Sequence, residues 1–435
     1  MERPDGPEPP SSPHVVRPIG LGMVLLILGG MLILGAAAKA PCASGGWTDG
    51  RQYRLLCYTD IVPLLGTEQL AGGRLPFLQP CVVVTGSNCD EYPVLTMYLM
   101  RMAGWVSDTD LPTFFAANAA LLWLCAGAVA VSLYAVAGAR ALYFVLSPTL
   151  LVYGLVNWDL FAVALATAAI PAFFLRRDVL AGILLGLGAS AKLYPAMLVV
   201  PLIAQRLQDR EPDGAIRLGW ATLGSWLAVN LPFALASPNA WLTFFRFNSQ
   251  RCADFDSLWA IGWRRLTGGS CPSTDVVNVA SAVAFGVLFV VVWAAKARRW
   301  PSFPRWTLMF PLVVVFLLTN KVYSPQYGLW LVPLFALALP DLRAFVAFSA
   351  TDVAVFVTRF WWFGSFEDLT LPGPVVAFLR FLGVDDPSPG VEQWMFELAV
   401  VMRAAVLVAC VVLWIRREPE FLSAEEPAPA LQAAA

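Results

Sequence analysis

The stretch IGLGMVLLILGGMLILGAAA, residues 19–38, contains no charged side chain. Twenty such residues make a helix about 30 Å long, which matches the hydrocarbon thickness of a bilayer. The overlapping motif AAAKA (36–40) resembles a signal-peptide cleavage site. The apolar run is longer than the hydrophobic region of a signal peptide, so we predict an uncleaved membrane anchor.

The composition of the whole chain indicates the same environment. Of the 435 residues, 58% are hydrophobic and only 14% are charged, and the mean hydropathy is +0.67. A soluble domain carries about a quarter charged residues, so we predict an integral membrane protein. The net charge of −1 provides no basic surface to neutralise phosphates, which argues against nucleic-acid binding.

Further apolar runs of spanning length follow, and with the first they make about twelve. We therefore predict an all-α polytopic fold of about twelve transmembrane helices, in which the short runs beside Asn157 and Lys192 are the least certain. The runs lie near 112–137, 141–156, 158–175, 179–191, 194–205, 217–236, 275–295, 305–319, 325–340, 343–363 and 395–415.

Lysine and arginine predict the orientation. With the N-terminus inside, alternate short loops such as QRLQDREPDGAIR (205–217) and KARRWPSFPR (296–305) carry the positive charge on the cytoplasmic side. We expect a multi-pass protein of the cytoplasmic membrane with both termini inside. Its predicted parts are a disordered N-terminus (1–18), a transmembrane domain (19–415) with outer loops 41–111, 237–274 and 364–394, and a cytoplasmic tail (416–435).

Six of the eight cysteines fall in the predicted outer loops, on the oxidising side of the membrane. An even number there indicates disulfides, with free thiols as the alternative. The second loop offers one natural pair, and the first allows three pairings, of which proximity favours the pairs of nearest cysteines. These expected pairs are Cys42–Cys57, Cys81–Cys89 and Cys252–Cys271.

Two apolar segments of the first outer loop are too short or too polar to span the membrane. They are IVPLLGTEQLAGG (61–73) and YPVLTMYLMRMAGW (92–105). We predict amphipathic helices lying along the outer leaflet, where they could roof a cavity open to lipid.

Charged residues beside membrane spans mark a pathway or an active site. Lys192 and Lys321 defy the positive-inside rule, and each adjoins a proline break, KLYP (192–195) and KVYSPQ (321–326). A broken helix with a lysine beside it suits an anionic ligand such as a phosphate. The other outward polar residues that we single out are Asp60, Asp90, Glu91, Asn157, Asp159, Tyr323, Gln326 and Arg359.

Each of these residues also has a structural explanation. Asp60 could cap the helix that contains Pro63, and capping is our preferred explanation of Glu91. Asn157 and Asp159 could satisfy backbone groups at a tight turn. The cations could snorkel to lipid headgroups, although snorkelling does not explain why both lysines adjoin a break.

A candidate carboxylate base with several cations fits sugar transfer from a lipid-linked phosphate donor. The cations would hold the leaving phosphate, and Asp60 would deprotonate an acceptor hydroxyl. The chain has no P-loop and no dinucleotide fingerprint, and a lipid donor needs neither. No Cys or His cluster has zinc spacing, so we predict no cofactor; a divalent cation held by Asp60, Asp90 and Glu91 is an unsupported alternative.

The order of five segments resembles glycosyltransferase family 87, the polyprenol-phosphate-mannose-dependent mannosyltransferases of actinobacteria, within the GT-C superfamily. The likeness covers roughly residues 20–340. The segments are YTDIVPLLGTEQLAGGRLPF (58–77), EYPVLTMYLM (91–100), LSPTLLVYGLVNWDLFAVAL (146–165), LAGILLGLGASAKLYPAMLVVPL (180–202) and NKVYSPQYGLWLVPL (320–334).

The resemblance implies a GT-C-like helical bundle with a catalytic acid in the first outer loop, a role that falls on Asp60. It also implies a polyprenyl-phosphate sugar donor and inversion at the anomeric carbon. Lys192 and Lys321 match positions where the family has a basic residue beside a proline, which implies contact with the donor phosphate, and Arg359 is a further candidate. The four cysteines of the first outer loop and the motif EYPV, where the family often has YPP, are departures that leave the sugar and the acceptor open.

The sequence thus predicts an inverting glycosyltransferase that moves a sugar, most simply mannose, to an envelope glycolipid, glycan or glycoprotein at the outer face. A polyprenyl-phosphate arabinose donor is one alternative. A transporter or flippase of a lipid-linked intermediate is another, but it should show inverted repeats and charges along a whole path. A non-catalytic scaffold would leave the outward lysines without a purpose.

Overall fold

The structure is a computed structural model that describes residues 19–82, 89–367, 377, 380 and 391–419. Over these residues the chain is helical and contains no strand. The predictions for 1–18, for most of the loop 364–394 and for the end of the tail lie outside the described residues.

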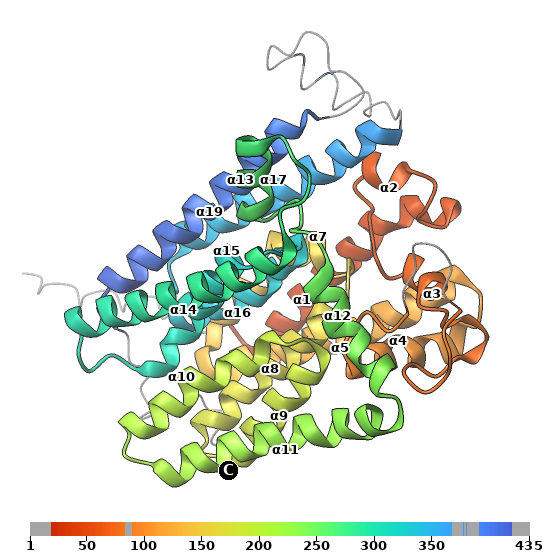
Figure 1. The fold of residues 1–435 in the computed structure, drawn as a ribbon. Coiled ribbons are helices and arrows are strands. Elements are labelled where there is room, and N and C mark those ends of the chain that lie inside the picture. The colour runs from red at the N-terminus through yellow and green to blue at the C-terminus, as the bar shows by residue number, and fades with distance from the viewer. Residues whose placement is uncertain (1–18, 83–88, 368–376, 378–379, 381–390, 420–435) are drawn as a thin grey trace, which may run out of the picture.

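Six helices of the described chain are long and apolar enough to cross a membrane, which makes this a multi-pass membrane protein. Each coincides with a run predicted from the sequence, and α17 packs along α19 (Figure 1). These helices are α1 (Leu21–Lys39), α5 (Leu111–Ala137), α11 (Pro212–Ala236), α14 (Thr274–Arg299), α17 (Leu342–Gly364) and α19 (Gln393–Arg416).

The number of about twelve spans is not confirmed, because the other apolar runs form shorter helices. The run 141–156 is divided at Ser147, and Pro148 opens its second half. Proline fits the first turn of a helix but cannot continue a preceding one. These shorter helices are α6 (Leu142–Val145), α7 (Pro148–Tyr153), α8 (Asp159–Phe174), α9 (Asp178–Ala191), α10 (Tyr194–Gln208), α15 (Met309–Thr319) and α16 (Gly328–Ala338).

Close packing of α9 on α11 depends on glycine. A Cβ atom on Gly182 would lie 2.5 Å from Leu218 O, and one on Gly186 would lie 2.3 Å from Thr222 O. Small residues four apart let two helix backbones approach closely, as in membrane helix pairs. The pair places α9 between α8 and α11, and it brings the break after Ala191 to a fixed place in the molecule.

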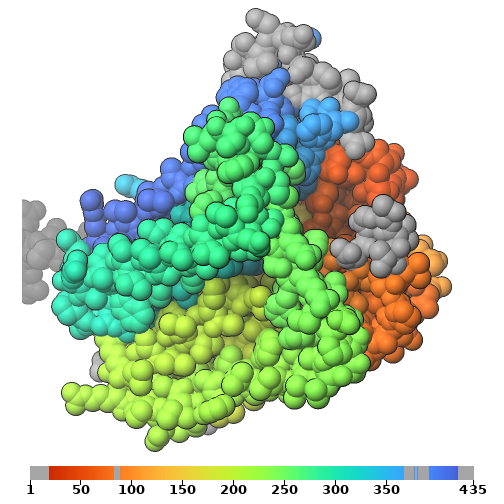
Figure 2. Space-filling model, in the orientation of Figure 1, coloured from red at the N-terminus to blue at the C-terminus, as the bar shows by residue number. Residues whose placement is uncertain are grey.

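Two connecting segments complete the fold. The first, between α1 and α5, contains α2 (Arg51–Arg54), α3 (Pro63–Thr67) and α4 (Val94–Ser107), together with the 3-10 turns Ala40–Gly45 and Ala71–Gly73. The second, between α11 and α14, contains α12 (Pro238–Gln250) and α13 (Leu258–Thr267). Figure 2 shows α12 on the surface beside the first connecting segment.

The predicted amphipathic segment 61–73 is not one helix. It divides into α3 and the short turn Ala71–Gly73, and between them Gln69 adopts a left-handed φ of 51° that interrupts the helix. Gly72 and Gly73, with φ values of 76° and 90° that glycine accepts readily, end the segment. The segment 92–105 forms most of α4. Whether either lies along a leaflet stays a prediction.

Three disulfides brace the connecting segments: Cys42–Cys57, Cys81–Cys89 and Cys252–Cys271. They are the pairs that proximity favoured. Two of them flank the residues of the site described next, since Cys57 precedes Tyr58 and Cys252 follows Arg251.

Candidate active site

A cavity of about 480 Å³ opens where the helix breaks meet the connecting segments. It is lined by residues of the two connecting segments, of the breaks near Asn157, Lys192 and Lys321, and of the C-terminal end of α17. Seven of the ten polar residues singled out from the sequence line it: Asp60, Glu91, Asn157, Lys192, Lys321, Gln326 and Arg359. The other three, Asp90, Asp159 and Tyr323, are buried and do not line it.

Asp60 is held by two side chains. The Tyr58 hydroxyl donates to Oδ1 at 2.5 Å, and the Asn157 amide donates to Oδ2 at 3.0 Å. Its backbone N–H donates to Val156 O at 2.8 Å. Burial raises the pKa of Asp60, against the lowering effect of these hydrogen bonds and of the Lys192 and Arg359 charges.

Asp60 does not cap a helix. Val62 is the N-cap of α3, and no side chain accepts a hydrogen bond from the first turn of that helix. The carboxylate is therefore available to the cavity, where each oxygen accepts one hydrogen bond from the groups above and keeps room for another.

Hydrogen bonds to both the nitrogen and the oxygen of its side-chain amide fix Asn157. Nδ2 also donates to the Tyr92 hydroxyl at 2.8 Å, and Oδ1 accepts from the Trp158 backbone N–H at 2.6 Å. Asn157 was expected to satisfy backbone groups at a turn, and its bond with the Trp158 N–H does this for one of them. Because the amide oxygen is engaged by a backbone donor, the nitrogen must point to Asp60, and this orientation presents a donor to the carboxylate.

Lys192 stands at the break between α9 and α10, where the backbone becomes extended (φ −157°, ψ 139°). Its ammonium lies 2.8 Å from Asp159 Oδ2, and the Trp330 indole N–H donates to Asp159 Oδ1 at 2.7 Å. The same ammonium lies 5.0 Å from the centre of the Tyr327 ring. Asp159 is fully buried, so it supports Lys192 rather than contacting a ligand.

Lys321 and Arg251 form a second cationic group. The Lys321 ammonium donates to the carbonyls of Ser249 and Arg251, each at 2.9 Å. Within the described chain no carboxylate pairs with Lys321, and Arg251 has only a long pair with Asp254, at 3.8 Å. Their positive charges are therefore less compensated than that of Lys192.

Arg359 is neutralised by the second connecting segment. Its guanidinium lies 2.5 Å from Asp256 Oδ1 and 3.6 Å from Asp254 Oδ1. Burial raises the pKa of Asp256 to about 6, against the effect of the Arg359 charge. Arg359 lines the cavity, but its pairing with two carboxylates reduces the positive potential that it can offer to an anion.

Tyr323 covers a buried ion pair. The Arg403 guanidinium lies 3.7 Å from the centre of the Tyr323 ring, and Arg403 Nη1 lies 3.1 Å from Asp352 Oδ1. The Tyr153 hydroxyl donates to Asp352 O at 2.9 Å. The sequence does not reveal this pair, because both charges lie inside long apolar runs. Through its contact with Tyr323, the ion pair positions the loop that bears Lys321 and Gln326.

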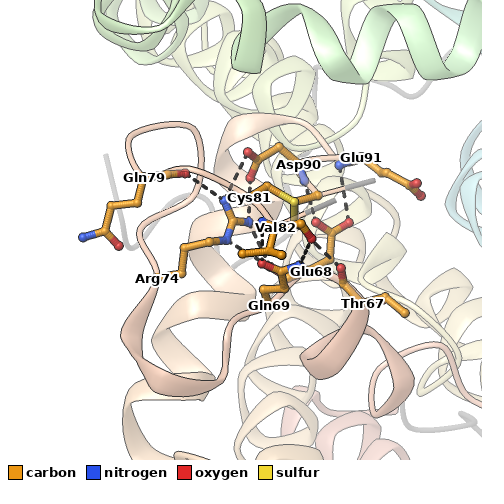
Figure 3. The surroundings of a disulfide bond; sticks show 10 residues. Thr67, Glu68, Gln69, Arg74, Gln79, Cys81, Val82, Asp90 and Glu91 are labelled. Atoms are coloured by element: carbon orange, nitrogen blue, oxygen red, sulfur yellow. Dashed lines mark hydrogen bonds and ion pairs between the residues drawn. A yellow bond between two sulfur atoms is a disulfide. The ribbon is translucent and has the colours of Figure 1, made fainter. Parts of the chain in front are cut away.

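Glu91 lines the cavity and does not cap α4, whose N-cap is Pro93 and has no side-chain cap. Its backbone is held from behind: the carboxylate of Glu68 accepts from the N–H of Asp90 at 2.6 Å and of Glu91 at 3.3 Å (Figure 3). Arg74 donates to Glu68 O at 2.8 Å and pairs with Asp90 at 2.9 Å. Burial raises the pKa of Glu68 to about 8.

The possible metal set Asp60, Asp90 and Glu91 does not form a metal-holding group among the described residues, and Asp90 pairs with Arg74 instead. Over the described residues no group of three or more acidic, histidine or cysteine side chains is arranged to hold a metal ion.

Several residues of the cavity wall were not predicted. Tyr58, Tyr92, Arg251 and Asp254 all line it. A signal for the last two exists in the motif RCADFD (251–256), where charges surround a cysteine in an outer loop. The tyrosines lie one or two residues from predicted acids, but tyrosine beside a membrane is too common to single out.

The chain belongs to glycosyltransferase family 87, since the model of that family matches residues 91–325. This confirms the resemblance seen in the sequence and identifies the class of protein as a glycosyltransferase. No curated protein matches the chain in sequence.

The chain is similar to solved structures at low sequence identity. One is ArnT from Cupriavidus metallidurans bound to undecaprenyl phosphate, at 16% identity and a TM-score of 0.45, covering 91% of this chain and 77% of that one. Another is the apo oligosaccharyltransferase of Archaeoglobus fulgidus, at 12% identity and a TM-score of 0.42, covering 93% of this chain and 61% of that one.

Proposed function

We propose that this glycosyltransferase moves a sugar from a polyprenyl-phosphate donor to a hydroxyl of an envelope glycolipid, glycan or glycoprotein, with inversion at the anomeric carbon. The observation that carries the proposal is one cavity in which a hydrogen-bonded carboxylate, Asp60, faces a set of cations. Mannose is the proposed sugar, by the family resemblance, and arabinose is the alternative.

In the proposed reaction, Asp60 accepts the proton of the acceptor hydroxyl as its oxygen attacks the anomeric carbon. The bond between that carbon and the phosphate oxygen breaks, and the bonding electrons leave with the phosphate. Attack opposite to the leaving group inverts the configuration. Tyr58 and Asn157 orient the carboxylate, so that its free lone pairs face the cavity.

The cations are proposed to stabilise the charge that develops on the leaving group. A sugar phosphodiester carries one negative charge, and the released lipid phosphate approaches two, so the need for positive charge grows along the reaction. Lys321 and Arg251 are the best placed, because their charges are least compensated. Lys192 and Arg359 also line the cavity, but carboxylates neutralise them.

The wall of the cavity suits a lipid donor. Phe244, Phe245 and Phe247 of α12 provide an apolar wall. Arg251 follows α12 directly and its guanidinium lies 5.3 Å from the centre of the Phe247 ring, so apolar and cationic groups are adjacent there. We propose that the catalytic domain is residues 19–415, in the cytoplasmic membrane with both termini inside and the cavity on the outer face. The disulfides beside Tyr58 and Arg251 support that side, since disulfides persist in oxidising compartments.

The test is sugar transfer by the purified full chain in lipid, with polyprenyl-phosphate mannose or arabinose and a membrane glycolipid extract as acceptor. We expect transfer by the wild type, loss of at least about a hundredfold in Asp60→Asn, and unchanged donor binding. Asp49→Asn, an exposed acid of the same connecting segment, is the control.

Transfer that survives Asp60→Asn would overturn the base assignment and direct attention to Glu91. Absence of transfer with either donor in the wild type would overturn the proposed donors and favour the transporter alternative.

A further inference from the structure

Lys39 is a buried cation at the end of the first membrane-spanning helix. It is 1% exposed, and its ammonium donates to Tyr58 O at 2.7 Å and lies 3.4 Å from Val152 O. The Phe356 ring of α17 covers it at 5.3 Å. Within the described chain its partners are these two carbonyls and that ring, and no carboxylate forms an ion pair with it.

Lys39 lies at one end of a series of contacts that dock residues 58–60 on the segment after α7. The Thr59 hydroxyl donates to Leu155 O, and the Asp60 N–H donates to Val156 O, each at 2.8 Å. At the other end of this series, the Asn157 amide donates to the Asp60 carboxylate. The ammonium is thus bonded to the backbone of Tyr58, whose hydroxyl is bonded to Asp60.

Closing the loop ahead of Tyr58 does not require a charged side chain at this place. The Cys42–Cys57 disulfide already closes the same loop directly before Tyr58. Taking an ammonium out of water costs several kcal/mol, and an apolar side chain of similar length would fill the space without that penalty. An apolar side chain would, however, leave the carbonyls of Tyr58 and Val152 without this donor, and the disulfide does not join the loop to α7.

We propose that Lys39 is a positioning residue for Asp60: by bonding Tyr58 O and Val152 O it holds the Tyr58–Asp60 segment against α7, so that the Tyr58 hydroxyl stays on the carboxylate. This inference rests on the proposed function, in which Asp60 is the base. The groups around Asp60 are Tyr58 on its own segment, Tyr92 ahead of α4, Asn157 after α7, Lys192 after α9, Arg359 on α17 and Lys39 on α1.

The proposal requires that α1 remains attached. Cleavage at the AAAKA motif after Ala40 would remove Lys39 from the mature protein. Intact mass of the purified chain checks this first, and a mature N-terminus at Pro41 would overturn the inference before any assay.

The main test compares Lys39→Gln with wild type in the transfer assay across pH. The side chain of Gln is one atom shorter than that of Lys, so its amide should not reach both carbonyls. We expect the rate to fall by about tenfold and the acidic limb of kcat/KM to move up by about one pH unit, because a carboxylate that loses the hydrogen bond of a displaced Tyr58 hydroxyl holds its proton more tightly. The KM for the donor should stay as in the wild type. In Lys39→Arg the acidic limb of kcat/KM should lie at the wild-type pH.

Lys296→Gln is the matched control. Lys296 is 2% exposed and its ammonium donates to two carbonyls, Trp414 O and Arg417 O, each at 2.7 Å, but it lies at the end of α14. Its loss should leave the acidic limb unchanged. If Lys39→Gln does not fold, Lys39→Met, which carries no buried polar group, should show the same shift.

An acidic limb that is unchanged in Lys39→Gln and Lys39→Met, while Asp60→Asn is inactive, would overturn this inference alone. Activity in Asp60→Asn would instead overturn the proposed function on which it rests.

Discussion

Lys192 and Asp159 form an ion pair at the wall of the cavity, with the ammonium nitrogen 2.8 Å from Oδ2. The two partners differ in exposure: Asp159 is fully buried, whereas 15% of the Lys192 side chain is exposed. The carboxylate therefore depends on the lysine and on Trp330 for compensation, while the lysine can also turn to a ligand in the cavity.

This asymmetry predicts unequal costs of substitution. Lys192→Met leaves a buried, uncompensated carboxylate, and we expect it to reduce the free energy of unfolding by about 3 kcal/mol. Asp159→Asn keeps an acceptor for Trp330 and should cost less. Thermal unfolding in detergent measures both, with Arg51→Gln, which breaks an exposed pair, as a control expected to cost under about 1 kcal/mol. Equal losses for the two variants would contradict the asymmetry.

Arg251 and Lys321 should govern the affinity for a lipid phosphate. Because a hydrogen bond to a charged group contributes about 1.5–3 kcal/mol, Arg251→Gln and Lys321→Gln should each weaken binding of a polyprenyl phosphate by about ten- to a hundredfold. Titration of the purified protein with polyprenyl phosphate measures this. The control is Arg246→Gln, which is on α12 but does not line this cavity. A loss in the control as large as in Arg251→Gln would argue against a specific site.

Glu68 should make stability depend on pH. Folding raises its pKa from 4.5 to about 8, so the native state holds the proton more tightly than the unfolded state. Its stabilising contribution is complete below pH 4.5 and is lost as the pH rises towards 8. We expect Glu68→Gln to gain stability relative to wild type between pH 5 and pH 8, as measured by denaturant unfolding at each pH.

The control for Glu68 is Glu392→Gln, an acid at an exposed position ahead of α19. Its stability relative to wild type should not vary over the same range. A difference between Glu68→Gln and wild type that is constant from pH 5 to pH 8 would show that Glu68 does not titrate there.

The Cys81–Cys89 disulfide should stabilise the segment that presents Glu91. With a sequence separation of 8, loss of the bond in a double Ser variant should cost roughly 2.5 kcal/mol by the loop-closure relation. Cys125→Ser, which removes a free and half-buried thiol, is the control. Denaturant unfolding of the two variants tests this, and a double variant as stable as the wild type would mean that the Glu68–Arg74–Asp90 contacts alone hold the segment.

The long helices were predictable because each contains an apolar run of bilayer length, as in α1 and α19. The shorter helices α8, α9 and α16 also coincide with predicted runs, but their apolar composition did not show that they are too short to count as membrane spans. Burial of α16 on nearly every side explains why it has no polar face to distinguish it from a span.

The gathering of Asp60, Lys192, Lys321 and Arg359 in one cavity agrees with their prediction as one site, although their roles stay predictions. What the sequence could not provide is the partner of each charge. Asp256 meets Arg359 from a distant segment, and Arg403 meets Asp352 between two helices, so no spacing along the chain reveals either pair. These partners decide which cations can serve a ligand: carboxylates already neutralise Arg359 and Lys192, whereas the charge of Lys321 is less compensated.

Asp60 and Arg359 line the same cavity although they belong to opposite ends of the chain. During biosynthesis Asp60 leaves the ribosome on the order of half a minute before Arg359, at usual rates of translation. In that interval the carboxylate has no completed cavity around it, because Arg359 and Phe360 of α17 are the last lining residues to be made. The cavity is therefore complete only once α17 has been inserted, so a protein truncated before α17 would insert its first helices and lack part of the cavity wall.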